Sequence, residues 1–296
     1  MPFLSFIIVN YNTRELLVQC LDNLKNIYPE KEIIVIDNGS GDDSAETVRA
    51  NYPDVILFES QNNGLAAASN IGLEKSRGDY LLYLGTDAFP GSDVILGILD
   101  FMEKNSQVGI LTPQLKLRDG TIDMDAHRGF PTPWAALTHF SGLNKLFPKS
   151  KWFNQYFLGY RDMSEPHEID LCISHFMFVR RKVFEQIGKW DQSFFLYGED
   201  VDFCYRAKSA GWKIMYLPQF SVLHYKGVTV GIRKETRDIS KADSATRSKM
   251  KTETTRAMRL FYEKHYKGKY PAWLTGLVIF GIEILTRFRK KGLFLG

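Results

Sequence analysis

The chain has 296 residues, of which 44% are hydrophobic and 24% charged, and its formal net charge is +4. These values are ordinary for a globular protein, and they allow one large α/β domain or two small ones. Many basic residues fall between residues 231 and 270, which predicts a surface suited to anionic head groups or phosphates. They lack interleaved aromatics and a recognisable nucleic-acid-binding module, so no nucleic-acid partner is expected.

The first seventh of the chain predicts alternating strands and helices. An apolar run at 4–9 is a strand, followed by a polar loop at 10–13 and leucines at helical spacing over 16–24. No basic residues precede this apolar run, and the polar Asn10 ends it, so it predicts a buried strand and not a signal peptide. A second strand at 32–37 ends in Asp37. Ligands of such sheets bind beyond the carboxyl ends of the strands, where Asp37 and the 10–13 loop are expected.

The pattern repeats to about residue 113. A strand at 55–58, a turn at 61–64 and a small-residue helix at 65–73 precede a strand at 79–84. Asp87 follows that last strand, so a second carboxylate is placed at a strand end. A helix over 92–104 and a strand over 108–113 complete this part.

Residues 116–167 are rich in proline and aromatics and predict an irregular insertion. Regular structure then resumes with a strand over 172–179, a helix over 181–187, and two strands over 212–217 and 220–224. The three cysteines (Cys20, Cys172 and Cys204) are widely spaced, which predicts reduced, packed thiols in a cytosolic setting.

Glu199 and Asp200 begin a predicted helix in which Phe203, Ala207 and Ala210 share one face and which Gly211 ends. Backbone N–H groups at a helix start favour ionised carboxylates, so Asp200 is expected to act as a base. Simple capping of the helix is the other interpretation, and the pair alone leaves both open.

The tail predicts two helices, over 246–266 and 271–288. The second is apolar but short for a membrane span, and Glu283 would be costly at the bilayer centre. Trp273 at its start and basic residues at 287–291 favour a helix lying in a membrane interface. Docking on the protein itself or at a homodimer contact is the alternative.

Taken together, these motifs resemble the family-2 glycosyltransferases of GT-A fold, in their bacterial rhamnosyltransferase-like branch. The resemblance covers about residues 3–290 and is carried by residues 7–12, 35–40, 63–72, 195–202, 206–207, 211–212 and 224. It implies an α/β fold with a Rossmann-like mixed sheet flanked by helices. The expected transferase domain is 1–230, with a nucleotide-sugar half (1–115) and an acceptor and catalytic half (116–230); residues 231–296 are a helical, membrane-associating extension.

The resemblance also implies a donor pocket for a nucleoside-diphosphate sugar, dTDP- or UDP-linked. Its expected residues are Val9, Tyr11, Asp37, Asn63, Gly64, Arg77, Thr86 and Asp87. A carboxylate at a strand end can accept hydrogen bonds from a base or ribose. The alternative for Asp37 is an Asx turn, and Asn63-Gly64 alone is a turn sequence.

Asp87 stands where the family binds a divalent metal, Mg²⁺ or Mn²⁺, and the resemblance implies His224 as the second ligand. A strand-end histidine without a ligand role is the alternative for His224. The sequence departs from the common D-x-D pattern because Gly85 occupies the other acidic position, so metal affinity is expected to be low.

By the same resemblance Asp200 would deprotonate the acceptor hydroxyl, giving an inverting transfer, and Glu199 would orient the acceptor. Arg128, Trp190 and Tyr197 are expected on the acceptor side, although residues 128–133 also read as a proline-stiffened surface loop.

The expected reaction moves a sugar, plausibly rhamnose, to a polyprenyl-diphosphate-linked saccharide in cell-surface polysaccharide biosynthesis, with peripheral contact through 271–291 on the cytoplasmic face of the membrane. One alternative is a degenerate, membrane-bound scaffold, motivated by Gly85. Sugar nucleotidyltransferases are a second, but they usually carry a Gly-rich basic loop after the first strand, unlike residues 10–14.

Overall fold

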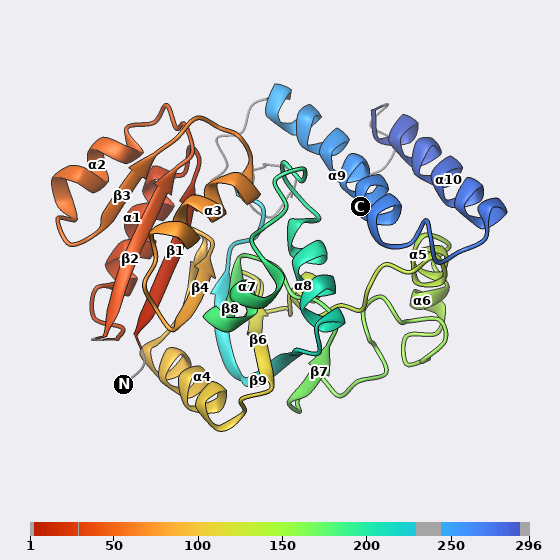
Figure 1. Cartoon of the computed structure of the whole chain (residues 1–296), viewed down its shortest axis with the longest axis horizontal. Coiled ribbons are helices and arrows are strands. Elements are labelled where there is room, and N and C mark those ends of the chain that lie inside the picture. Colours follow the sequence, from red (N-terminus) through yellow and green to blue (C-terminus); the bar gives the residue numbers. More distant parts are fainter. Residues whose placement is uncertain (1–2, 29, 229–243, 291–296) are drawn as a thin grey trace.

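The computed structural model describes residues 3–28, 30–228 and 244–290. As predicted, the centre is a mixed β-sheet with helices on both faces, and two long helices follow at one end (Figure 1). The strand order is β3-β2-β1-β4-β8-β6-β9-β5, with β7 paired to β9.

The first half of the chain forms the parallel part of the sheet. Its elements are β1 (Leu4–Asn10), α1 (Arg14–Leu24), β2 (Lys31–Asp37), α2 (Ser44–Asn51), β3 (Ile56–Glu59), α3 (Leu65–Lys75) and β4 (Tyr80–Leu84). β1 pairs in parallel with β2 and β4, and β2 with β3. Phe6 and Ile8 pack into the core on one face and Ile7 into the core on the other, which explains the continuous apolar run.

The second half completes the sheet and adds the insertion. Its elements are β5 (Ala88–Phe89), α4 (Ser92–Lys104), β6 (Val108–Lys116), η1 (Met124–Ala126), α5 (Pro133–Phe140), α6 (Leu143–Leu146), β7 (His167–Ile169), β8 (Phe176–Arg180), α7 (Arg181–Ile187), α8 (Glu199–Ser209) and β9 (Lys213–His224). β8 runs antiparallel between β4 and β6. The start of β8 therefore lies at the same edge of the sheet as the end of β4.

The two strands predicted over 212–217 and 220–224 are one continuous strand, β9. Pro218 and Gln219 interrupt the apolar pattern, but the chain accommodates them in an irregularity where β9 shifts register against β6 between Pro113 and Gln114. The prediction of two strands was therefore wrong. Helix α2 was missed because only Ser44, Ala45 and Val48 are buried in a short, mostly polar sequence.

The two helices predicted in the tail are present as α9 (Ser244–His265) and α10 (Ala272–Lys290). α9 packs beside α8, and α10 packs beside α9 (Figure 1). Within the described parts of the chain, the helices all fall short of the length and apolar character that crossing a bilayer requires.

Candidate active site

The carboxyl ends of β1 and β2 bring the first expected donor residues together. Asn10 and Asp37 are register partners, and Asn10 Nδ2 donates to Asp37 Oδ2 over 2.9 Å. The backbone N–H of Ser40 donates to Asp37 Oδ1 over 2.8 Å, so the Asx turn is present as well. Val9 and Tyr11 flank Asn10 and are both half-buried. The structure thus places Val9, Tyr11 and Asp37 at one edge of the sheet.

Gly64 joins this edge to the loop that leads into α8. Its φ of 96° and ψ of 168° define a conformation that is essentially restricted to glycine. A Cβ at Gly64 would lie 2.4 Å from the carbonyl oxygen of Phe195, and the N–H of Leu65 donates to that same oxygen over 2.7 Å. The Asn63-Gly64 turn is therefore packed directly against the segment that precedes Glu199 and Asp200.

Arg77 does not lie at this edge. Its Nε is 3.2 Å from Oε2 of Glu32, at the amino end of β2, and its side chain is 74% exposed. The structure therefore separates Arg77 from the other expected donor residues, and we exclude it from the donor site.

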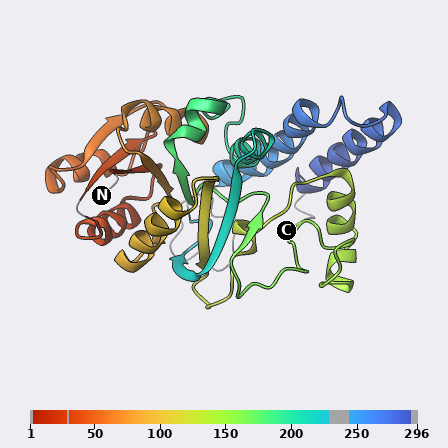
Figure 2. The same cartoon turned by 60° about the horizontal axis from the view of Figure 1, so that its bottom comes forward.

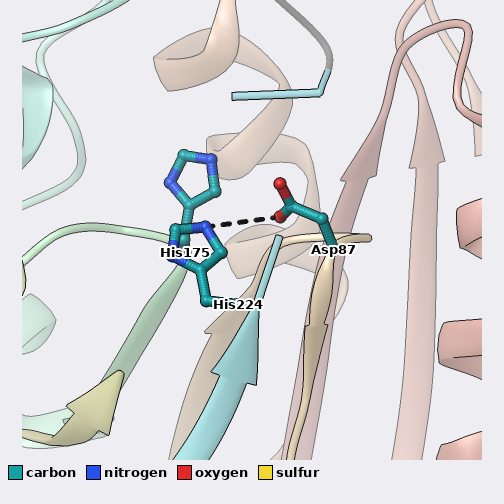
Figure 3. Close-up of side chains that lie close together, drawn as sticks. All are labelled: Asp87, His175 and His224. Carbon is teal, nitrogen blue, oxygen red and sulfur yellow. Dashed lines mark ion pairs between the residues drawn. The ribbon is translucent and has the colours of Figure 1, made fainter. Parts of the chain in front are cut away.

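A cluster of three potential metal ligands lies just beyond β4 (Figure 3). One ligand atom each from Asp87, His175 and His224 lies within 4.8 Å of the others. His224 Nε2 is 3.6 Å from Asp87 Oδ1, because β5 pairs with β9 and sets Ala88 opposite His224. Thr86 is buried beside Asp87, with its hydroxyl 3.0 Å from that of Thr13.

Asp123 orients His224 for this role. Asp123 Oδ2 lies 3.0 Å from His224 Nδ1, and since an ionised carboxylate only accepts, the proton of a neutral ring stands on Nδ1. Nε2 is then left with its electron pair free, and this atom is buried without a hydrogen-bond partner in the described part of the chain. Such a carboxylate–histidine pair is typical of metal sites, and the orphaned Nε2 fits a cation.

The charge of Asp123 is itself stabilised. Burial alone would raise the pKa of Asp123, but its hydrogen bond to His224 and the charge of Lys226 outweigh burial and hold the pKa well below its usual range. Asp123 is 1% exposed and is therefore a fixed acceptor for His224.

Glu199 and Asp200 occupy the first turn of α8 and are both buried. The N-cap is Gly198, so neither carboxylate stands at the N-cap position, although Asp200 accepts a hydrogen bond from a backbone N–H of the first turn. Burial first, and then the charge of Asp200, raise the pKa of Glu199 to about 8. Glu199 therefore holds a proton at neutral pH, and one of its oxygens, Oε2, is buried without a hydrogen-bond partner among the described residues.

Asp200 differs from Glu199 in having a cationic neighbour. Arg128 Nη2 is 3.7 Å from Asp200 Oδ2, and the N–H of Val201 donates to Asp200 Oδ1 over 2.8 Å. Burial raises the pKa of Asp200 above its ordinary value, and the Arg128 charge offsets only part of this rise. The helix start alone does not depress this pKa, contrary to expectation. The pair nevertheless contains one acid and one carboxylate that Arg128 favours as an anion.

The three residues expected on the acceptor side lie in different surroundings. Arg128 is fixed in the protein, since its Nη1 donates to Tyr156 Oη over 3.1 Å and its Nε to the carbonyl of Asp125 over 2.7 Å. Tyr197 is half-buried beside α9, with a φ of 67°. Trp190 is 3% exposed and stacks on Phe203 in the core, so we exclude it from an acceptor site.

Sequence reasoning missed His175 and Asp123. His175 precedes the buried run of β8, and the residues before a strand face the ligand edge only when that strand is antiparallel to its neighbours. The apolar pattern of 176–179 carries no sign of strand direction. Asp123 lies in the irregular insertion, where no periodicity places a side chain.

Comparison with known protein families gives one match over most of the chain. Residues 5–188 match Glycosyl transferase family 2. An N-acetylglucosaminyl-diphospho-decaprenol L-rhamnosyltransferase of Mycobacterium tuberculosis is 28% identical over 213 residues, which are 67% of this chain and 68% of that protein. The rhamnosyltransferase WbbL of Escherichia coli K12 is 27% identical over 235 residues, which are 74% of this chain and 82% of WbbL.

Solved structures share the fold. A mannosyltransferase from Pyrobaculum calidifontis, in complex with GDP-Man and Mn²⁺, aligns with a TM-score of 0.57 at 16% identity over 96% of this chain and 70% of that one. GalNAc-T7 with UDP, GalNAc and Mn²⁺ aligns with a TM-score of 0.56 at 18% identity over 76% of this chain, but this chain covers only 44% of GalNAc-T7. The mixed sheet is thus similar to that of GT-A glycosyltransferases.

The family match and the two rhamnosyltransferases agree with the arrangement of carboxylates at the strand ends. The chain belongs to glycosyl transferase family 2, in its rhamnosyltransferase-like branch, and it is a glycosyltransferase.

Proposed function

We propose that the protein is an inverting transferase that moves a sugar, plausibly rhamnose, from a dTDP- or UDP-linked donor to a hydroxyl of a lipid-linked saccharide. The observation that carries the proposal is the convergence of two groups at one edge of the sheet. Asp87 and His224 of the cluster, and Asp200 of the pair, all interact electrostatically with His175. A leaving diphosphate and an attacking hydroxyl need these two kinds of group side by side.

In this proposal the donor lies over the carboxyl ends of β1, β2 and β4. Val9, Tyr11 and Asp37 would contact the base and ribose, and Asn63, Gly64 and Thr86 the rest of the nucleotide sugar. The buried Asp37 carboxylate keeps lone pairs for ligand N–H or O–H groups beyond its bonds to Asn10 and Ser40. Asp87 and His224 would hold a divalent cation, which offsets the charge of the diphosphate leaving group when it is bound.

Asp200 would accept the proton of the acceptor hydroxyl as that oxygen attacks the anomeric carbon. Two features support Asp200 over Glu199 as the base. Arg128 stabilises the Asp200 anion, whereas the raised pKa of about 8 keeps Glu199 protonated and able to donate a hydrogen bond to the acceptor. Arg128 fixes Asp200 in place, and Tyr197 borders the acceptor side. Attack from the face opposite the diphosphate would invert the anomeric configuration.

We also propose that α10 makes the peripheral membrane contact that a lipid-linked acceptor requires, on the cytoplasmic face of the membrane. Trp273, Leu277 and Phe280 of α10 are each more than half exposed, and Arg287 and Arg289 follow on the same helix. An apolar face bordered by basic residues is typical of helices that lie in a membrane interface. The M. tuberculosis relative is named for a lipid-linked acceptor, which agrees with this proposal.

Two substitutions test the division of roles. Asp200→Asn is expected to abolish transfer, a loss of at least about 100-fold for a general base, while donor binding changes little. Asp87→Ala is expected to weaken metal-dependent donor binding. Transfer is measured with a nucleotide-release assay and binding by calorimetry with UDP- or dTDP-sugars and Mn²⁺. An equal loss of donor binding in both variants would contradict the assignment, and a wild type that binds no donor would favour the scaffold alternative.

A further inference from the structure

The position of Gly85 explains how the cluster manages without a second carboxylate from the same loop. A Cβ at Gly85 would stand 2.7 Å from Asp87 Oδ1 and 2.9 Å from Cδ2 of the His175 ring. The backbone N–H of Gly85 also donates to the carbonyl of His175 over 2.9 Å. The space that a side chain at residue 85 would enter is therefore already occupied by the Asp87 carboxylate and by the imidazole of His175.

The His175 ring is placed where it could coordinate a metal ion together with Asp87 and His224. Its ring centroid lies 5.1 Å from that of His224, and both rings stand on the same side of Asp87 as seen in Figure 3. The three ligand atoms lie within 4.8 Å of one another. Two ligands of one ion, each bound at about 2.0–2.2 Å, stand about 3 Å apart at right angles and about 4 Å apart when opposite, so the three side chains have to move inward for one ion to bind all of them.

We propose that His175 is a third metal ligand that replaces the missing carboxylate, and that this two-histidine, one-aspartate site prefers a first-row transition ion over Mg²⁺. The inference rests on the proposed function for the presence of a cation. Imidazole nitrogen favours transition ions, whereas Mg²⁺ prefers oxygen ligands and keeps its waters. The substitution at position 85 then marks a change of metal preference and not a loss of the site.

The test uses the full chain with Mn²⁺, alone and with UDP or dTDP. Electron spin-echo spectroscopy of bound Mn²⁺ is expected to report two imidazole nitrogens in the wild type and one in His175→Ala, with at least about a 10-fold loss of Mn²⁺ affinity. His175→Gln serves if the alanine variant does not fold, and His139→Ala in α5 is the matched control outside the cluster. Adding Gly85→Asp to His175→Ala is expected to restore binding while lowering the Mg²⁺ concentration that displaces Mn²⁺.

A single imidazole in the wild type, or an unchanged affinity in His175→Ala, would overturn the inference while leaving the transfer reaction untouched. A wild type that binds no Mn²⁺ under any of these conditions would overturn it too. Donor binding measured without added metal then decides separately whether the proposed function stands.

A second, independent observation concerns the surface of the insertion. Of the twelve large hydrophobic side chains found exposed in the described residues, ten lie on two segments. Six are in the insertion (Trp134, Leu137, Phe140, Leu146, Phe147 and Trp152) and four on α10 (Trp273, Leu277, Phe280 and Phe288). α5 and α6, in yellow-green, and α10, in dark blue, lie at the same end of the molecule in both Figure 1 and Figure 2.

The insertion also has the charge of a surface that contacts anionic lipid. Residues 129–161 contain no aspartate or glutamate, but they contain Lys145, Lys149, Lys151 and Arg161. Apolar side chains bordered by lysines and arginines suit the interface of a negatively charged leaflet. A second copy of the same basic surface would be repelled, which argues against a symmetric dimer through this face.

This surface is attached firmly to the catalytic residues. The Nε1 of Trp134 donates to the carbonyl of Trp152 over 2.7 Å, closing the segment on itself. Arg128, directly before residues 129–161, contacts both Tyr156 of that segment and Asp200 of α8. On the other side, Arg289 of α10, whose pKa is lowered by burial, interacts with Tyr156 and Tyr197.

We infer that the exposed face of residues 134–152 is a second membrane-contacting surface, which acts together with α10 and sets the base Asp200 close to the bilayer. The inference rests on the proposed lipid-linked acceptor, but its test needs neither donor nor acceptor. Large exposed side chains make suitable targets because their replacement leaves the core intact.

The experiment is co-sedimentation of the full chain with vesicles of phosphatidylglycerol and phosphatidylethanolamine. The double variant Leu137→Ser, Phe140→Ser is expected to lower partitioning at least about 10-fold, as is Leu277→Ser, Phe280→Ser on α10. Leu96→Ser, at an exposed position on α4 away from both segments, is the matched control. The inference would be overturned if the insertion variant bound vesicles as strongly as the wild type. It would also be overturned if the wild type dimerised through this face and did not bind vesicles.

Discussion

At the scale of single residues, the chemistry depends on two adjacent carboxylates that share a helix turn but differ in protonation. Glu199 lies at the first position of α8 and is 3% exposed. Asp200 lies at the second and has Arg128 as its counter-ion. The helix start alone cannot distinguish the two, since both positions face the same N–H groups. The distinction comes from Arg128, which belongs to the insertion more than seventy residues earlier in the chain.

The raised pKa of Glu199 makes stability depend on pH in a defined window. Between its ordinary value of 4.5 and about 8, the folded protein holds a proton on Glu199 that the unfolded chain releases. The free energy of unfolding must therefore fall as pH rises through this window, by up to about 1.4 kcal/mol per pH unit.

Glu199→Gln removes this contribution. Urea unfolding between pH 5 and 8 is expected to show a flatter dependence on pH for Glu199→Gln than for the wild type. Glu185→Gln, at an exposed position on α7, is the matched control for loss of a carboxylate. Parallel curves for Glu199→Gln and the wild type would mean that Glu199 is ionised in the folded protein.

At the scale of elements, the site depends on contacts between segments that are remote in sequence. β5 pairs with β9 to set Asp87 beside His224, and the antiparallel β8 delivers His175 to the same edge. α9 is attached to α8 through Asp202, which accepts from Arg206 Nε over 2.8 Å and lies 2.7 Å from His265 Nε2. Burial would raise the pKa of Asp202, but its hydrogen bonds with His265 and Lys264 and the charge of Arg206 lower the pKa to about 2.

The turn at Gly64 is the contact between the donor edge and the catalytic loop, and it allows a matched comparison of two glycines. Gly64→Ala is expected to cost more than the roughly 1–3 kcal/mol of backbone strain alone, because the new Cβ would also collide with Phe195. Gly142→Ala has a φ of 80° but no neighbour within 4 Å, so it carries the strain without the collision.

Thermal unfolding and donor binding measure the difference between the two variants. Gly64→Ala is expected to lose more stability than Gly142→Ala and also to weaken donor binding, whereas Gly142→Ala should bind donor like the wild type. Equal losses of stability, with donor binding intact in both, would mean that the close approach of Gly64 to Phe195 has no role in the site.

At the scale of the whole molecule, the sequence predicted the parts of the fold whose signal is local. β1, β2 and β4 are buried on both faces and read as apolar runs, and α4 was predicted at its observed bounds, Ser92–Lys104. Asp37, Asp87 and His224 each follow or end a strand, so their common position at one edge of the sheet could be inferred from the sequence alone.

Features set by strand direction and tertiary packing could not be predicted in this way. His175 was missed because its place depends on β8 running antiparallel. Arg77 was misplaced because a residue in the loop before β4 lies at the amino edge of a parallel sheet, opposite the donor site. Trp190 was taken for an acceptor residue because a tryptophan in a loop carries no mark of burial in the sequence.

The central claim is that the clustered carboxylates and histidines at the strand ends bind a nucleoside-diphosphate sugar with a divalent cation. It is tested most directly by thermal unfolding of the wild type and Asp87→Ala against a panel of nucleoside-diphosphate sugars, each with and without Mn²⁺ or Mg²⁺. A ligand that binds only the folded state raises the melting temperature. We expect one nucleotide family to raise it in the wild type in a metal-dependent way, and Asp87→Ala to lose the metal dependence. A wild type that no donor stabilises, or a shift that Asp87→Ala leaves unchanged, would contradict the claim.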